Sequence, residues 1–113
     1  MINELAKEIN ETAMKNGWWK HYIEFRNHSI GLEVLGNKIC LMHSELSEAL
    51  EALRNNSISE HIPNHSHVAE ELADTVIRIL DYAYMNNFDM EKVIRAKIDY
   101  NKTRPYRHGG KKF

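Results

Sequence analysis

Cysteine, proline, glycine and long apolar runs are all scarce in this sequence. Its 113 residues include 1 cysteine, 2 prolines and 5 glycines. The single cysteine, Cys40, excludes an intrachain disulfide framework and is typical of a reducing compartment. No apolar run approaches the roughly 18 residues of a membrane span, and the first residues lack the basic flank of a signal peptide. We therefore expect one cytoplasmic domain, residues 1–113, that has no contact with a membrane.

The charge balance is near zero only as an average over the chain. All together, 15 basic and 16 acidic side chains give a formal net charge of −1. Residues 1–91 contain 7 basic and 15 acidic side chains, whereas residues 92–113 contain 8 basic ones and only Asp99. The acidic body would repel a long polyanion, so we expect no nucleic-acid partner. The basic tail, about residues 102–113, is either a solvated end or a surface that binds anions.

Apolar residues recur at helical spacing, and no segment alternates at strand spacing. Helices are predicted over residues 2–16, 30–54 and 68–86, and from Asp89 to just before Pro105. The aromatic segment 18–25 shows no clear period, and residues 55–67 have the composition of a polar loop. The sequence therefore predicts an all-α fold, a bundle of four to five helices.

The helix predicted over residues 30–54 carries apolar residues on two sides. A second strip lies beside the main stripe at 100° per residue, and Cys40 is expected to be a buried, inert thiol. Two apolar sides need two partners, so we expect this helix to be central and the chain to self-associate. The main stripe consists of Leu32, Leu35, Ile39, Met42, Leu46, Ala49 and Leu53, and the second strip of Val34, Leu41 and Ala52.

Two pairs of carboxylates each lie one helical turn apart. Glu45 and Glu48 fall within or beside the second apolar strip, and Glu71 and Asp74 repeat the spacing on the next helix. Keeping these groups ionised beside apolar residues is costly, and a divalent cation removes that cost. Oxygen ligands favour Mg²⁺, with Mn²⁺ as an alternative, over Zn²⁺. The other interpretation is a solvated acidic face with surface ion pairs.

The same four acids carry a resemblance to a known family. Glu45-x-x-Glu48, 22 intervening residues and then Glu71-x-x-Asp74 resemble the ExxE…ExxD signature of the MazG-like all-α nucleoside triphosphate pyrophosphohydrolases. Many members have a further acid just before the first motif residue, where this chain has Ser44. The number of metal ions is therefore left open.

The end of the chain is similar to this family as well. Residues 100–113 resemble the C-terminus of some small bacterial and phage members, so the resemblance covers about residues 30–113. It implies a helix bundle of the family's type, in the cytoplasm of a bacterial or phage-infected cell. Together with the two apolar sides of the central helix, it leads us to expect a homodimer or a dimer of dimers, with the catalytic crevice near the interface.

The resemblance implies Mg²⁺-dependent hydrolysis of a (deoxy)nucleoside triphosphate between the α and β phosphates, giving a nucleoside monophosphate and pyrophosphate. Glu45, Glu48, Glu71 and Asp74 would be both the metal ligands and the catalytic residues. One of them, with Glu48 as a candidate, would accept the proton of the attacking water. Polar and basic residues near the C-terminus would bind the substrate, namely Lys97, Asn101, Lys102, Arg104, Arg107 and Lys111.

Three other interpretations belong beside this one. The chain could be a non-enzymatic helical module that binds another protein through its acidic body and basic tail. The loop histidines could indicate zinc, although they lack a recognised set of zinc ligands. The two adjacent tryptophans either pack beside a helix end or stack on a base. The residues concerned are His61, His65 and His67, and Trp18 and Trp19.

Overall fold

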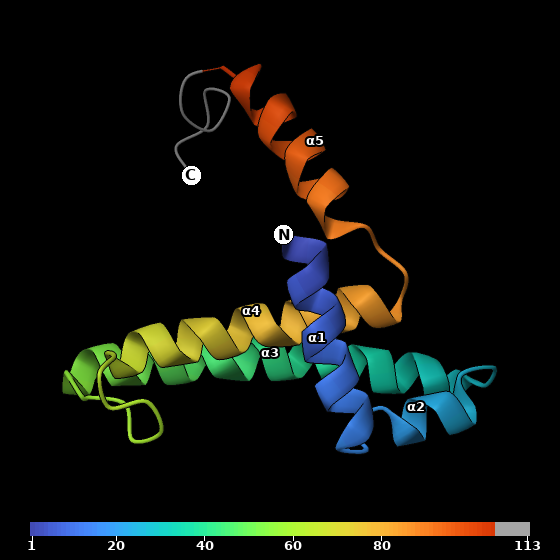
Figure 1. Cartoon of the computed structure of the whole chain (residues 1–113), viewed down its shortest axis with the longest axis horizontal. Coiled ribbons are helices and arrows are strands. Elements are labelled where there is room, and N and C mark those ends of the chain that lie inside the picture. Colours follow the sequence, from blue (N-terminus) through green and yellow to red (C-terminus); the bar gives the residue numbers. More distant parts are fainter. Residues whose placement is uncertain (106–113) are drawn as a thin grey trace.

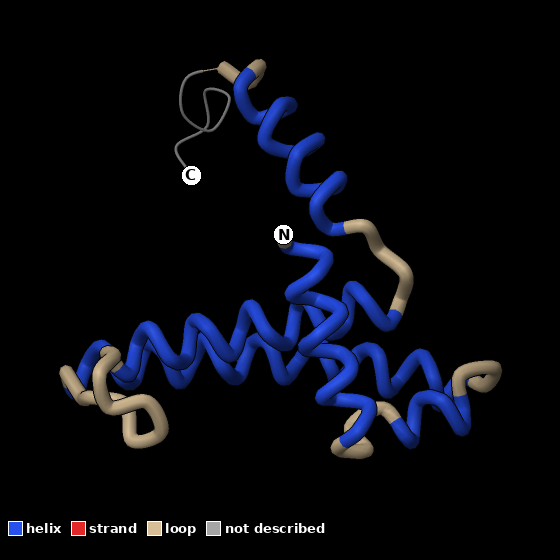
Figure 2. Tube along the Cα trace, viewed as in Figure 1, coloured by secondary structure: helices blue, strands red, loops and turns tan. Residues whose placement is uncertain are grey.

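Five helices joined by loops form the protein, which we describe from a computed structural model over residues 1–105. The all-α prediction is confirmed, since no strand occurs within these residues (Figure 2). The four predicted helices are confirmed to within about two residues at each end, and the unassigned aromatic segment contributes a short fifth helix. The helices are α1 (Ile2–Lys15), α2 (Lys20–Phe25), α3 (Ser29–Asn55), α4 (His67–Met85) and α5 (Met90–Lys102).

Polar residues set the helix boundaries. Ser66 precedes α4 and its hydroxyl accepts a hydrogen bond from the Ala69 backbone N–H at 3.0 Å. Asp89 serves α5 in the same way, accepting from the Lys92 N–H at 3.2 Å. These caps satisfy backbone donors that the first turn of a helix leaves without a partner. At the other end of α3, Asn56 adopts a left-handed conformation with φ of 46° and ends the helix.

Helices α3 and α4 run antiparallel, side by side along the long axis of the molecule, and α1 crosses them (Figure 1). The short α2 packs against the beginning of α3, because Gly31 has no side chain there. A Cβ at Gly31 would lie 2.7 Å from the Arg26 Cα, which is too close for any other residue. Helix α5 contacts the N-terminal end of α1 and projects away from the α3–α4 pair (Figure 1). None of the described helices is both long and apolar enough to cross a membrane.

The core of the described chain is small and built mainly from alanine. Its buried apolar residues are five alanines together with Trp19 and Leu80. The strip on α3 that faces α4 contains the buried Glu45 and Ala52, so this strip forms the contact within the chain. The main stripe of α3 is instead largely open to solvent: Leu32 is 74% exposed and Leu53 65%. Of the two apolar sides predicted for α3, residues 1–105 cover mainly the one that faces α4.

The prediction of a buried thiol at Cys40 is wrong. The Cys40 side chain is exposed. One residue further along the helix is Leu41, which lies in the pocket lining between α1, α3 and α4. A rotation of 100° per residue turns Cys40 away from that pocket, and no described element covers it there. Apolar neighbours in the sequence do not make a helical residue buried.

Candidate functional site

The two predicted carboxylate pairs meet where α3 and α4 pack together. One carboxylate oxygen from each of Glu45, Glu71 and Asp74 lies within 4.8 Å of the others. Glu45 and Glu71 are each only 8% exposed, so this cluster lies mostly out of water. Glu48 is exposed and lies beside Glu45, close enough for their carboxyl groups to share a hydrogen bond. The packing of α3 against α4 therefore brings three of the four predicted acids together, and the fourth, Glu48, lies exposed at their side.

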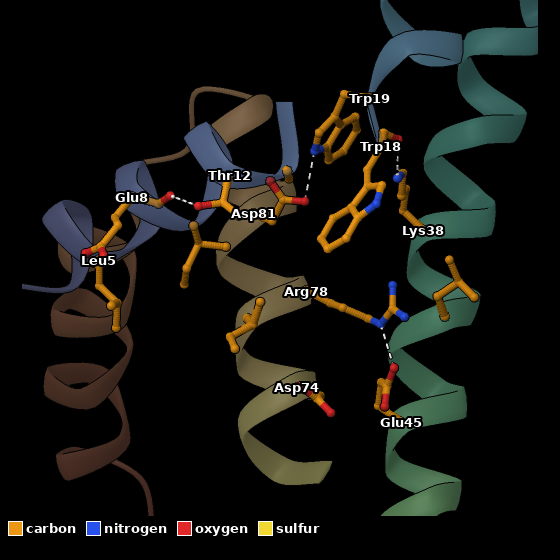
Figure 3. A pocket seen from close by; sticks show the side chains of 14 residues that line it. Leu5, Glu8, Thr12, Trp18, Trp19, Lys38, Glu45, Asp74, Arg78 and Asp81 are labelled. Carbon is orange, nitrogen blue, oxygen red and sulfur yellow. Dashed lines mark hydrogen bonds and ion pairs between the residues drawn. The ribbon is translucent and has the colours of Figure 1, made fainter. Parts of the chain in front are cut away.

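One guanidinium is placed among these acids. The Arg78 Nε donates a hydrogen bond to the Glu45 Oε1 at 2.9 Å (Figure 3). Burial alone would raise the pKa of Glu45, but hydrogen bonds from Arg78 and from the neighbouring carboxyls of Glu48 and Glu71 outweigh it. The pKa of Glu45 therefore lies below its ordinary value.

The other three acids hold their protons more tightly than usual. The hydrogen bond with Glu45, and the charge of Glu45, raise the pKa of Glu48. Burial raises the pKa of Glu71, and the hydrogen bond with Glu45 adds to this effect. Burial and the charges of Glu45 and Glu70 raise the pKa of Asp74. Each of these shifts reflects the cost of gathering negative charge, which a bound cation would remove.

A pocket of about 750 Å³ adjoins the acids and lies between α1, α3 and α4 (Figure 3). Glu45 and Asp74 lie at one end of its lining, and Lys38 and Arg78 contribute positive charge. Trp18 is 59% exposed and also belongs to the lining. The pocket thus combines an acidic end, two cations and an aromatic surface. Its other lining residues are Leu5, Glu8, Ile9, Thr12, Ala13, Trp19, Leu41, Ile77 and Asp81.

At the end of the pocket away from Glu45, a hydrogen-bond network has its buried part at Asp81. The Asp81 carboxylate accepts from the Asn10 side chain and from the Trp19 Nε1, each at 2.8 Å. The Lys38 Nζ donates to the Trp18 carbonyl at 2.8 Å and lies 4.5 Å from the centre of the Trp19 ring. Burial lowers the pKa of Lys38. This network ties α1, the tryptophan turn and α3 to α4, so it fixes the shape of the pocket.

Of the substrate-binding residues predicted near the C-terminus, the four that the structure describes do not line this pocket. Lys97, Asn101 and Lys102 lie on α5, which projects away from it, and Arg104 follows α5 (Figure 1). The Lys97 Nζ lies over the Tyr100 ring, and the Lys102 Nζ lies 4.0 Å from an Asp99 carboxylate oxygen. The remaining two predicted residues, Arg107 and Lys111, lie outside the described residues.

Sequence reasoning assigned no role to Lys38 or Arg78. The structure places Arg78 beside Glu45, and Lys38 in the lining of the pocket next to Trp18. A signal for both exists in their spacing. Lys38 lies seven residues before Glu45, and Arg78 lies four residues after Asp74, so each shares a helix face with a motif acid. The spacing puts them on the correct face, but only the register between α3 and α4 brings Arg78 to Glu45.

The histidines behind the zinc interpretation lie close to the carboxylates at the start of α4. One ligand atom from each of His67, Glu70 and Glu71 lies within 4.8 Å of the others. His61 and His67 each lie within hydrogen-bond distance of a carboxylate of α4, at 2.9 Å for Glu70 and 2.8 Å for Glu71. His65, in the same loop, makes hydrogen bonds to described residues through its backbone. These contacts connect the α3–α4 loop with the acidic crevice.

Comparisons of the chain with protein-family models, with curated proteins and with solved structures found no match.

Proposed function

We propose that this protein hydrolyses (deoxy)nucleoside triphosphates between the α and β phosphates in a Mg²⁺-dependent reaction. The observation that carries the proposal is the convergence of Glu45, Glu71 and Asp74 within 4.8 Å beside a pocket of about 750 Å³. Carboxylates at this separation fit a hard divalent cation, and Mn²⁺ could replace Mg²⁺. The resemblance of the ExxE…ExxD spacing to the MazG-like pyrophosphohydrolases points to the same chemistry.

The four acids have distinct parts in this proposal. Glu45, Glu71 and Asp74 hold the cation, with Glu48 beside them as a fourth ligand. When bound, the metal would neutralise phosphate charge and lower the pKa of an attacking water. Glu48 is also the best candidate to accept the proton of that water, because it is exposed and its raised pKa brings it closer to neutral pH.

The pocket would bind the phosphates and the base of the substrate. Arg78 would bind phosphate oxygens at the end near the acids, where phosphoryl transfer needs positive charge. Lys38 would add positive charge at the other end of the pocket, beside Trp18. The exposed Trp18 ring would contact the base, since aromatic faces stack on bases of any identity. The residues of α5 remain candidates for phosphate binding only if a second copy of the chain brings them to the crevice.

We further propose that a second copy of the chain covers the open side of α3 and α4. The radius of gyration is 16.8 Å, whereas a compact domain of this length has roughly 13 Å. Three leucines on α3 and three apolar residues on α4 are spaced as single helical stripes and are more than one-third exposed. They are Leu46, Leu50 and Leu53, and Leu72, Val76 and Ile79. A homodimer or a dimer of dimers would bury them.

The test is pyrophosphate release from each common ribo- and deoxyribonucleoside triphosphate with Mg²⁺. At least one nucleotide should yield pyrophosphate and monophosphate, and Glu48→Gln should lower the rate about 100- to 10,000-fold. Glu51→Gln is the matched control, because Glu51 is exposed on the same helix and pairs with Arg54 at 3.7 Å. Its rate should equal that of the wild type. Release from none of the nucleotides would refute the proposal.

The main alternative is a non-enzymatic helical module that binds another protein through its acidic body. Thermal melting separates the two possibilities without any assay of activity. A metal-dependent nucleotide site should stabilise the fold by about 2.7 kcal/mol when ligand is present at 100 times its Kd. A module without that site should show no shift with Mg²⁺ and a triphosphate.

A further inference from the structure

The imidazole of His67 is held on both sides. His67 is the first residue of α4, and its Nδ1 lies 2.8 Å from the Ser57 Oγ in the preceding loop. Its Nε2 lies 2.8 Å from the Glu71 Oε1, one helical turn further along. The ring is partly buried, and Glu71 is buried. Ser57, His67 and Glu71 therefore form a continuous chain of hydrogen bonds that ends at the acidic crevice.

The chemistry of the partners decides the direction of these hydrogen bonds. A carboxylate oxygen accepts, so the Nε2 carries the hydrogen and donates it to Glu71. In the neutral ring the Nδ1 then accepts from the Ser57 hydroxyl. With both ring nitrogens engaged, the imidazole has one orientation. The Glu71 carboxylate bonded to it is restricted in the same way, because turning about its last bond would break the contact.

The adjacent acid is engaged differently. Both oxygens of the Glu70 carboxylate have partners from the same loop: the Ser59 hydroxyl donates to Oε1 at 2.6 Å, and the His61 Nδ1 lies 2.9 Å from Oε2. The loop therefore occupies both oxygens of Glu70 and only Oε1 of Glu71. This contrast leaves Glu71 oriented toward Glu45 and Asp74, whereas Glu70 serves to anchor the loop.

We propose that His67, held by Ser57, is a positioning residue that fixes the Glu71 carboxylate for cation binding with Glu45 and Asp74. The inference rests on the proposed function, because it assigns a role within the same metal centre. Groups that hydrogen-bond to a metal ligand fix its direction, and their loss typically weakens metal binding about 10- to 100-fold. His67 thus acts through Glu71 and touches neither metal nor substrate.

Mn²⁺ binding, followed by the electron paramagnetic resonance signal of the free ion, tests this role in the full-length protein. His67→Ala should raise the Kd for Mn²⁺ about 10- to 100-fold. His67→Gln should restore most of the affinity, because the glutamine amide nitrogen lies as many bonds from the backbone as Nε2 and also donates. His65→Ala, two residues earlier in the α3–α4 loop, is the matched control and should bind Mn²⁺ like the wild type. Circular dichroism and thermal melting of each variant identify loss of fold.

Kinetics provide a second measurement that a purely structural role would not reproduce. His67→Ala should raise the Mg²⁺ concentration needed for half-maximal activity, while kcat at saturating Mg²⁺ stays near that of the wild type. Ser57→Ala should shift the same Mg²⁺ dependence in the same direction, by a smaller factor. This second variant also keeps the test available if His67→Ala does not fold.

The outcomes separate this inference from the proposed function. If His67→Ala binds Mn²⁺ like the wild type while Glu71→Gln loses binding, the proposed metal centre is supported and the positioning role of His67 is refuted. A nitrogen coupling from imidazole in the spin echo of bound Mn²⁺ would make His67 a direct ligand, and would also refute it. If the wild type binds no Mn²⁺ and releases no pyrophosphate, both proposals fall.

Discussion

Replacing Trp19 by phenylalanine should destabilise the fold strongly. Trp19 is fully buried, and its Nε1 donates to the buried Asp81 carboxylate at 2.8 Å. Phenylalanine removes that donor, and the loss of a hydrogen bond to a charged group costs about 1.5–3 kcal/mol. The smaller ring also leaves space in the core, which adds about 1 kcal/mol. We expect a total loss of about 2.5–4 kcal/mol, a large part of the 5–15 kcal/mol typical of a domain.

Urea denaturation at pH 7 measures this loss directly, and thermal melting provides a second reading. At about 4 °C per kcal/mol for a domain of this size, Tm should fall by roughly 10–16 °C. Trp18→Phe is the matched control: Trp18 is 59% exposed, so its free energy of unfolding should change by less than about 0.5 kcal/mol. A loss below about 0.5 kcal/mol for Trp19→Phe would show that the Asp81 network does not stabilise the pocket.

Three further predictions address the site, the open face and the loop. Arg78→Met should raise the KM for the nucleotide about 10-fold or more in steady-state assays, whereas Lys97→Met on α5 should leave it unchanged unless a second copy supplies that residue. Leu50→Glu, which puts a charge on the open face of α3, should convert the proposed oligomer to monomer in analytical ultracentrifugation, and an unchanged sedimentation coefficient would contradict the proposed interface. The hydrogen bond to Glu70 raises the pKa of His61, so their pairing should stabilise the fold below about pH 6.5 and cease to do so as the pH rises through the His61 pKa in the folded state. The difference in Tm between the wild type and His61→Ala should therefore be present at about pH 5.5 and absent at about pH 9.

The helices are predictable from the sequence because their signals are local. The stripe of α3 continues through six steps of three or four residues, and a cap such as Asp89 marks where the next helix begins. The short α2 has no such signal, since six residues are too few to establish a period. Which side of α3 the chain covers depends on long-range packing. The main stripe has the stronger pattern, yet the strip containing Glu45 faces α4.

The acids of the candidate site are predictable from the sequence because their spacing along each helix is a local signal. The basic residues that accompany them are not predictable in this way. Spacing of three residues on two helices puts each pair on one face, and antiparallel packing brings the pairs together. The cation at Glu45 is Arg78, and the register of α4 against α3 determines that its guanidinium lies beside this carboxylate. The overall charge pattern pointed instead to the basic C-terminal residues, but the chain turns after α4 at Asn87, with φ of 61°, and α5 leaves the crevice.

A crystal structure with Mn²⁺ and a nucleoside triphosphate analogue whose α–β bridge cannot be hydrolysed tests the proposed metal centre most directly. Anomalous scattering locates Mn²⁺ independently of the protein model. We predict at least one anomalous peak within coordination distance of Glu45, Glu71 and Asp74, with the phosphates next to Arg78 and the base in the pocket beside Trp18. Mn²⁺ and nucleotide bound away from these acids, or a full-occupancy nucleotide with no metal between them, would contradict the proposal.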